Sequence, residues 1–131
     1  MNTNHPPALR VFLVEDSPVV LERLEALLGS IEGVSTIDHA ASASEAIRGI
    51  VAAHPDVVVL DVKLADGTGF DVLRAVRAQA PEVDVYMLSN FATEPYRRLA
   101  AQLGAQDFFD KSTEFECVRE AIAARARAKL H

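Results

Sequence analysis

The chain alternates between two kinds of hydrophobic pattern. Short apolar runs rich in β-branched residues are typical of strands buried in a parallel sheet, and longer stretches with apolar residues three or four positions apart are typical of amphipathic helices. Strands are expected at residues 11–14, 34–39, 57–60, 83–88 and 105–110, and a helix follows each of them. Such alternation predicts a parallel sheet with helices on both faces, joined by right-handed crossovers.

Capping residues indicate where the helices begin. A Ser or Thr side chain just before a helix can accept a hydrogen bond from a free N–H group of the first turn. The expected caps are Ser17, Ser42, Thr68, Thr93 and Thr113. Residues 63–67, which follow the third strand, are expected to form a loop. We expect one domain at residues 9–127, between a flexible N-terminal arm at residues 1–8 and a tail at residues 128–131.

The order of the strands decides which of their ends meet. The commonest doubly wound order for five strands is 2-1-3-4-5, which predicts an α/β fold of the flavodoxin-like type, a (βα)5 three-layer sandwich. In that order the first and third strands are neighbours at the switch point, where the carboxyl ends of the strands form a ligand crevice. Glu15 and Asp16 follow the first strand, and Asp61 follows the third. We therefore expect these carboxylates to meet in one crevice.

Composition narrows the function and the location. The 131 residues carry a net charge of −6, whereas nucleic-acid binding needs clustered Lys and Arg, so no nucleic-acid partner is expected. The single cysteine can form no disulfide within the chain. The sequence has neither a leader-like pattern nor an apolar run of membrane-spanning length. A cytoplasmic protein without a membrane partner is therefore expected, with a small partner protein or a metal ion as its ligand.

Polar residues end four of the predicted strands. Glu15, Asp16 and Asp61 would repel one another in one crevice without a cation, and oxygen ligands with room for water suit Mg²⁺. Lys111 can offset the remaining charge or meet an incoming phosphate, and the Ser89 hydroxyl can donate to a phosphoryl oxygen. The simpler alternative is a Lys–Asp ion pair beside a serine that merely ends a strand.

Taken together, these motifs resemble the receiver domain of two-component response regulators. The similarity runs from residue 9 to about residue 125 and rests on four segments in the right order, VFLVED, VVVLDVKLADGTGFDVL, YMLSN and GAQDFFDKS. It implies a phosphoprotein of phosphorelay signal transduction that takes a phosphoryl group from a sensor histidine kinase or a histidine phosphotransfer protein. The phosphoacceptor would be Asp61, and the resulting aspartyl phosphate would switch a surface that binds a downstream target protein.

The resemblance also implies a metal site. The cofactor would be Mg²⁺, held by Asp16, Asp61 and the backbone carbonyl of Lys63, with Glu15 acting mainly through water. Such a protein is not an enzyme with an external substrate, because it catalyses only its own phosphorylation and dephosphorylation.

Three further residues acquire roles in this scheme. Lys111 would neutralise charge on the transferring phosphoryl group, a task of positioning and electrostatics. Ser89 would follow the phosphate inward, and the family pattern makes Phe108 the aromatic that turns from exposed to buried as that space empties. For Phe108 the alternative is a purely structural residue of a buried strand.

Departures from the family pattern keep other functions open. Ser112 stands where the family usually has a proline after the lysine, and Asn90 stands where it tends to have a small residue. These two positions favour an alternative, a pseudo-receiver that acts as a protein-interaction module without phosphotransfer. A Mg²⁺-dependent phosphohydrolase is a weaker third hypothesis, because no general acid lies near Asp61 in the sequence.

Two other features receive structural interpretations. Cys117 lies in the last predicted helix without a nearby base, and a half-buried packing role is expected. Arg97 and Arg98 of the preceding helix are expected on a solvated face, with a contact patch for a partner as the alternative.

Overall fold

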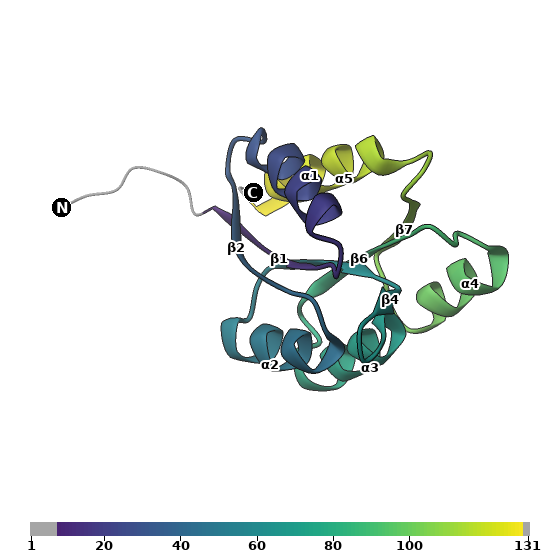
Figure 1. The fold of residues 1–131 in the computed structure, drawn as a ribbon. Coiled ribbons are helices and arrows are strands. Elements are labelled where there is room, and N and C mark those ends of the chain that lie inside the picture. Colours follow the sequence, from purple (N-terminus) through teal and green to yellow (C-terminus); the bar gives the residue numbers. More distant parts are fainter. Residues whose placement is uncertain (1–7, 130–131) are drawn as a thin grey trace.

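The computed structural model describes residues 8–129 and has a central sheet between two helical layers (Figure 1). The strands of this sheet are β1 (Leu9–Val14), β2 (Val34–Ala40), β3 (Val57–Asp61), β6 (Asp84–Ser89) and β7 (Asp107–Asp110). The helices are α1 (Pro18–Gly29), α2 (Ala43–Ala53), α3 (Gly69–Gln79), α4 (Glu94–Gln102) and α5 (Phe115–Lys129). Residues 1–7 of the predicted arm and residues 130–131 of the predicted tail lie outside the described residues, so the domain boundaries stay a prediction.

The order of the strands is the one expected. The sheet runs β2-β1-β3-β6-β7, which is 2-1-3-4-5 when the strands of this sheet are numbered along the chain. Every neighbouring pair is parallel. Helices α1 and α5 cover one face, and α2, α3 and α4 cover the other (Figure 1). The predicted doubly wound, flavodoxin-like fold is therefore confirmed.

The central strand β3 is buried along its whole length. Val58 and Leu60 pack on the side of α2, α3 and α4, whereas Val57 and Val59 pack on the side of α1 and α5. Burying each of these aliphatic side chains stabilises the fold by roughly 1.5–3 kcal/mol. Because a slip of one residue would exchange the two faces, this packing fixes the register and holds Asp61 at the carboxyl edge of the sheet.

Three of the five predicted caps are confirmed. Ser17 Oγ accepts from the N–H of Val20 at 3.3 Å, and Ser42 Oγ accepts from that of Glu45 at 3.2 Å. The hydroxyl of Thr68 and the carboxylate of Asp71 form a reciprocal capping box.

The caps predicted at Thr93 and Thr113 fare differently. Thr93 occupies the N-cap position of α4 as predicted, but its side chain makes no capping hydrogen bond. The cap predicted at Thr113 is wrong. Helix α5 begins at Phe115, later than Thr113 would place it. A turn delays this helix, since the N–H of Glu114 donates to the carbonyl of Asp110 at 2.7 Å.

The loop predicted at residues 63–67 is also a misassignment. The segment forms a small antiparallel hairpin of β4 (Lys63–Leu64) and β5 (Gly67–Thr68), in which Leu64 lies opposite Gly67. A two-residue turn at Ala65 and Asp66 joins the strands. Strands of two residues carry too little hydrophobic periodicity to be recognised by pattern.

The remaining differences lie near the end of the chain. Strand β7 begins at Asp107 instead of residue 105, and the peptide between Lys111 and Ser112 is trans. Cys117 is exposed, which corrects the expected half-buried role, because the buried face of α5 carries Phe115 and Val118. None of the helices within residues 8–129 has the length and apolar character needed to cross a membrane.

Candidate functional site

The carboxyl edge of the sheet holds a pocket of about 230 Å³. The ends of β1, β3, β6 and β7 and the start of α1 supply its walls. Its lining residues are Glu15, Asp16, Ser17, Val20, Asp61, Lys63, Ser89, Asn90, Phe91 and Lys111. All the predicted site residues except Phe108 therefore lie around one cavity.

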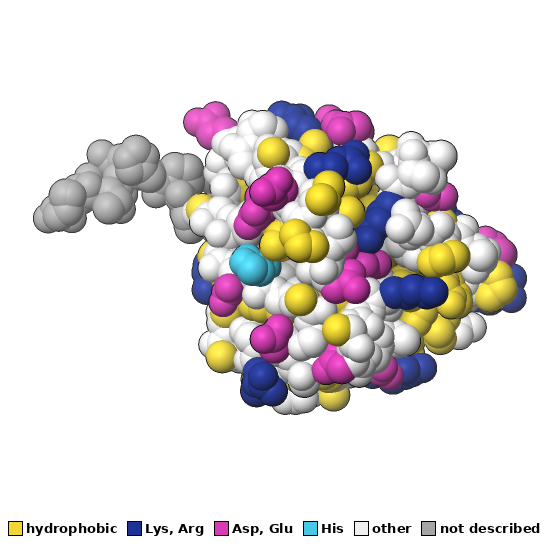
Figure 2. Space-filling view, in the orientation of Figure 1, with side chains coloured by type: hydrophobic (Ala, Val, Ile, Leu, Met, Phe, Trp, Pro, Cys, Tyr) yellow, Lys and Arg dark blue, Asp and Glu magenta, His cyan; other side chains and the backbone are white. Residues whose placement is uncertain are grey.

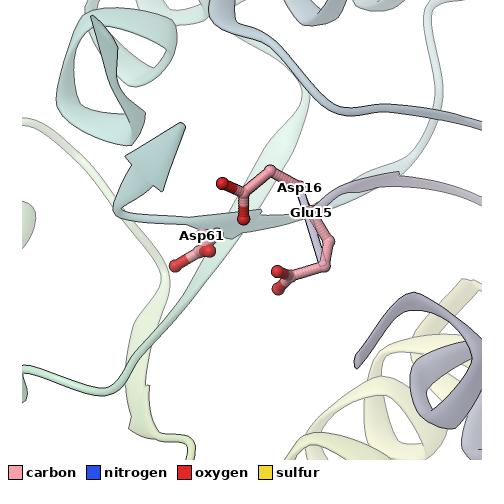
Figure 3. A group of neighbouring side chains, drawn as sticks. All are labelled: Glu15, Asp16 and Asp61. Atoms are coloured by element: carbon pink, nitrogen blue, oxygen red, sulfur yellow. The ribbon is translucent and has the colours of Figure 1, made fainter. Parts of the chain in front are cut away.

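Two neighbouring strands bring the carboxylates together. Val14 of β1 lies opposite Leu60 of β3, so the acids that follow these residues leave the sheet side by side. Glu15, Asp16 and Asp61 each place a carboxylate oxygen within 4.8 Å of the others (Figure 3). Glu15 and Asp61 are buried, whereas Asp16 is exposed. The expected meeting of these acids in one crevice is confirmed.

Lys111 provides the positive charge of the pocket. Its Nζ lies 3.0 Å from Asp61 Oδ2 and 2.9 Å from Glu15 Oε1, and its side chain is 9% exposed. Burial alone would lower the pKa of Lys111, but the contact with Glu15 and the charge of Asp61 outweigh burial and raise the pKa. Lys111 is therefore charged at neutral pH and faces both buried acids.

Glu15 is held by the backbone and by Lys111. Its Oε2 accepts from the N–H of Ser17 at 3.0 Å. Burial raises the pKa of Glu15 more than the Lys111 contact lowers it, and the charge of Asp61 raises it further. Within the described residues, Glu15 Oε1 is buried and its one charged partner is Lys111, which contacts it as an ion pair and also contacts Asp61. The pocket thus has more negative charge than one lysine neutralises.

The end of β6 forms the opposite wall. Ser89 is 1% exposed, and its hydroxyl oxygen accepts from the N–H of Phe91 at 2.9 Å. The N–H of Lys111 donates to the carbonyl of Ser89 at 2.9 Å, which ties the wall to the loop after β7. Among the residues that the structure describes, the Ser89 hydroxyl serves as an acceptor, so its own hydrogen can be donated to a ligand.

Two side chains meet at the rim of the pocket. Lys63 Nζ lies 4.4 Å from the centre of the Phe91 ring, a cation–π distance. Phe91 is 48% exposed, so this contact is at the surface. Across this face of the molecule, acidic and basic side chains are interspersed and form no large patch of one sign (Figure 2).

Phe108 lies outside the pocket and is buried, with 6% of its surface exposed. Arg97 of α4 covers it: Nη1 donates to the Phe108 carbonyl at 2.9 Å, and Nη2 donates to Glu114 Oε1 at 3.1 Å. Arg97 is therefore only partly solvated, with 35% of its side chain exposed, whereas Arg98 is exposed as expected. The sequence carried no signal for this contact, because the partners of Arg97 belong to other elements.

Two residues near Asp61 were also missed. The N–H of Gly69 donates to the Val62 carbonyl at 2.7 Å, and a Cβ at Gly69 would lie 2.1 Å from the Asp61 carbonyl oxygen. Asp66 bonds the start of α2, 23 residues before it in the chain. The glycine could have been noticed as the start of a helix beside the acceptor, but nothing local indicates the partner of Asp66.

The donor set of the pocket fits Mg²⁺. Hard carboxylate oxygens from Glu15, Asp16 and Asp61 converge, and the exposed Asp16 leaves room for water. The described part of the chain offers no other group of three or more such ligands. A small divalent cation would relieve the repulsion that Lys111 leaves uncompensated.

Comparison with known proteins agrees with this arrangement. The chain is 36% identical over 133 aligned positions to the alkaline phosphatase synthesis transcriptional regulatory protein SphR of Synechococcus elongatus, covering 95% of this chain and 49% of that protein. It is 34% identical over 103 residues to the DNA-binding transcriptional activator DevR/DosR of Mycobacterium tuberculosis, covering 79% of this chain and 48% of the relative. The chain thus spans about half the length of these curated relatives.

A solved structure and a family model lead to the same conclusion. A two-component response regulator of the LuxR family from Aurantimonas superposes with a TM-score of 0.86 at 26% identity, covering 92% of this chain and 86% of that one. The family model described as the response regulator receiver domain matches residues 11–123. The chain belongs to the receiver domain family of two-component response regulators.

Proposed function

We propose that this receiver domain accepts a phosphoryl group on Asp61 in a Mg²⁺-dependent reaction. One observation carries the proposal: Lys111 Nζ lies 3.0 Å from Asp61 Oδ2 in a pocket where Glu15 and Asp16 also converge. An isolated ion pair would need only one acid, whereas a phosphoryl group needs a nucleophile, a cation site and a positive side chain together.

The reaction begins with Asp61. A carboxylate oxygen of Asp61 attacks the phosphorus of a phosphohistidine on the donor protein, and an O–P bond forms as the N–P bond breaks. The electron pair of the broken bond returns to the imidazole nitrogen, which takes a proton from solvent. The product is an aspartyl phosphate on this chain and a neutral histidine on the donor.

Lys111 and Ser89 act on the transferred group. The Lys111 ammonium, now bound to Asp61 and Glu15, is placed to follow a phosphoryl oxygen as negative charge builds up beside it. The Ser89 hydroxyl lines the same pocket and can donate to another phosphoryl oxygen. Both groups stabilise the product and the transition state electrostatically.

The metal would be held by Asp16, Asp61 and the backbone carbonyl of Lys63, with Glu15 acting through water. When bound, Mg²⁺ supplies positive charge that offsets the phosphoryl oxygens. Asp16 and Asp61 contribute ligands from adjacent strands, and Lys63 lines the same pocket.

Signalling would follow from Ser89. The Ser89 hydroxyl oxygen accepts a hydrogen bond from the Phe91 N–H. When this hydroxyl turns to a phosphoryl oxygen, that bond changes and the segment that carries Phe91 shifts. The expected turn of Phe108 from exposed to buried is not supported, because Phe108 is already buried while Lys111 is still paired to Asp61. The surface of α4 and β7 would therefore change with the charge on Asp61 through the segment after Ser89. The partners would be a histidine kinase or phosphotransfer protein and a downstream target protein, in the cytoplasm.

A second candidate function is a protein-interaction module without phosphotransfer. One observation favours it: Asn90 lines the pocket, and the Lys63–Phe91 contact lies at the rim, so access to Asp61 is narrowed. Phosphotransfer has the stronger support, because a pure interaction module has no need to keep Glu15 and Asp61 buried beside Lys111.

The test is incubation with acetyl phosphate and Mg²⁺, followed by intact-mass spectrometry. The wild-type chain should gain one acid-labile phosphoryl group, Asp61→Asn should gain none, and the exposed β2 residue Asp38 should be replaceable by Asn without effect. A wild-type chain that stays unmodified while it keeps its fold supports the interaction module. Labelling retained in Asp61→Asn refutes Asp61 as the acceptor.

A further inference from the structure

Asp66 connects the acceptor loop to a distant helix. It lies at the turn of the β4–β5 hairpin, with Leu64 and Ala65 between it and Lys63, yet its carboxylate reaches the start of α2. Oδ1 accepts from the N–H of Ala43 at 2.5 Å, and Oδ2 accepts from that of Ser44 at 3.2 Å. These N–H groups favour the ionised carboxylate and lower the pKa of Asp66.

The first turn of α2 divides its N–H donors between one acid, Asp66, and one hydroxyl, that of Ser42. The local cap Ser42 accepts only the N–H of Glu45, at 3.2 Å. The two preceding N–H groups, which have no partner within the helix, go to Asp66 instead. Because Ser42 already caps α2, the helix does not depend on Asp66 alone. The hydrogen bonds of Asp66 also hold the hairpin against the helix.

The hairpin has few other contacts to hold it. Its residues are exposed apart from Leu64, which is half-buried, and two-residue strands have little stability of their own. Its far end is held by the Thr68–Asp71 capping box, and the bond from the Gly69 N–H to the Val62 carbonyl ties its two ends together. A Cβ at Gly67 would lie 3.6 Å from Ala43 Cβ, so the turn approaches α2 closely. The bonds from Asp66 therefore fix the turn of the hairpin.

We infer that Asp66 is a positioning residue, which holds the hairpin on α2 so that the Lys63 carbonyl is presented to the metal beside Asp61. The inference rests on the proposed function, since it concerns the same Mg²⁺ site. Asp66 lies in the turn that joins the strand of Lys63 to its partner strand, so a turn released from α2 would move the Lys63 backbone as well. Asp66 itself is no ligand, because its two oxygens already bind backbone N–H groups.

Binding and positioning are reciprocal in such an arrangement. If the site binds Mg²⁺ more tightly when the hairpin is held on α2, then bound Mg²⁺ stabilises that position of the hairpin by the same free energy. Metal binding should therefore slow amide hydrogen exchange at Ala43 and Ser44, on a helix that contributes no residue to the metal site. A residue that only capped the helix would give no such response.

The experiment compares Asp66→Ala with Ser42→Ala, which removes a cap from the same turn of α2 without touching the hairpin. Mg²⁺ affinity is measured by titration calorimetry, and exchange at Ala43 and Ser44 is followed with and without Mg²⁺. Asp66→Ala should weaken Mg²⁺ binding by roughly tenfold, the lower end of the effect of supporting residues at metal sites, and abolish the exchange response. Ser42→Ala should keep wild-type affinity and response.

Asp66→Asn provides an intermediate variant and replaces Asp66→Ala should that variant fail to fold. Its carbonyl oxygen can still accept from Ala43, so part of the affinity should return. The inference is overturned if the Asp66 variants bind Mg²⁺ as tightly as wild type, or if Ser42→Ala loses as much affinity as Asp66→Ala. A wild-type chain that binds no Mg²⁺ at all overturns the proposed function and this inference with it.

Discussion

Lys111 Nζ and Asp61 Oδ2 lie 3.0 Å apart, although 50 residues separate them in the chain. Strand β6 lies between the strands that carry them, so the Lys111 side chain reaches over the end of β6, where Ser89 is located. The contact depends on the sheet order, and it places one positive charge against two buried acids. Its consequences differ for stability and for metal binding.

Replacing Lys111 by Ala should separate these two consequences. Glu15 and Asp61 would stay buried without a counter-charge, so the free energy of unfolding should fall by about 3 kcal/mol. The same change removes a positive charge that repels a divalent cation, so Mg²⁺ should bind roughly tenfold more tightly. Urea unfolding and Mg²⁺ titration measure the two effects.

The control for this variant is Lys129→Ala, which removes a lysine far from the pocket. Lys129 binds Asp56 and the Ala8 carbonyl, so its loss should leave Mg²⁺ affinity unchanged. Weaker Mg²⁺ binding in Lys111→Ala than in wild type would contradict the electrostatic account of the pocket.

Gly69→Ala should disrupt the acceptor strand. A Cβ at this position would lie 2.1 Å from the Asp61 carbonyl oxygen, so backbone must move, and we expect a loss of about 3 kcal/mol in unfolding free energy together with loss of phosphorylation. Gly29→Ala is the matched control, because no atom lies within 4 Å of its Cβ and alanine favours the helix. Thermal unfolding that ranks the two variants alike would show that the close approach has no cost.

Asp56 should make stability depend on pH. Its Oδ2 accepts from the Arg10 N–H at 2.8 Å and from Lys129 Nζ at 2.7 Å. Burial opposes ionisation, but these hydrogen bonds and the Lys129 charge outweigh it and lower the pKa of Asp56 below 3.8. Because the folded-state pKa is depressed, the contribution is present above the unfolded-state pKa and is lost as pH falls through the folded-state value.

The corresponding experiment is urea unfolding of wild type and Asp56→Asn across a pH series. At neutral pH the unfolding free energy of wild type should exceed that of the variant by about 2 kcal/mol, which is in the range of a hydrogen bond to a charged group. The difference should vanish in acid. A difference that stays constant down to the most acidic pH would show that the charge of Asp56 does not stabilise the fold.

The strands, the helices and the meeting of Glu15, Asp16 and Asp61 could be predicted because each depends on a local pattern plus a topological rule. Buried strands such as β3 are continuous apolar runs, and the doubly wound order places the ends of β1 and β3 together. The hairpin at residues 63–68 escaped prediction because its strands are too short to show a period.

The long-range polar contacts were equally beyond reach. Arg97 lies in a helix segment of exposed character, and only the tertiary structure places the carbonyl of Phe108 and the carboxylate of Glu114 within its reach. Thr93 is a different case, since it occupies the N-cap position expected of it but its side chain makes no capping bond. Contacts between side chains and groups of distant elements produce no periodic pattern in the sequence.

Arg97→Ala should loosen the contact between α4 and the end of β7. The variant loses the bonds to Phe108 and Glu114, and because the ion pair is partly exposed we expect only about 1 kcal/mol of lost stability. Amide exchange near Phe108 should speed up, whereas Arg98→Ala, at the exposed neighbouring position, should leave both quantities unchanged. Equal behaviour of the two variants would show that Arg97 does not hold the segment.

The most direct test of the central claim is a crystal structure of the chain with Mg²⁺ and beryllofluoride, a phosphoryl analogue. The account predicts the analogue on the Asp61 carboxylate, Mg²⁺ bound by Asp16 and Asp61, and Lys111 turned from Asp61 to a fluoride. A structure grown at saturating concentrations in which the ion and the analogue lie away from Asp61, with Lys111 still paired to it, would contradict the account.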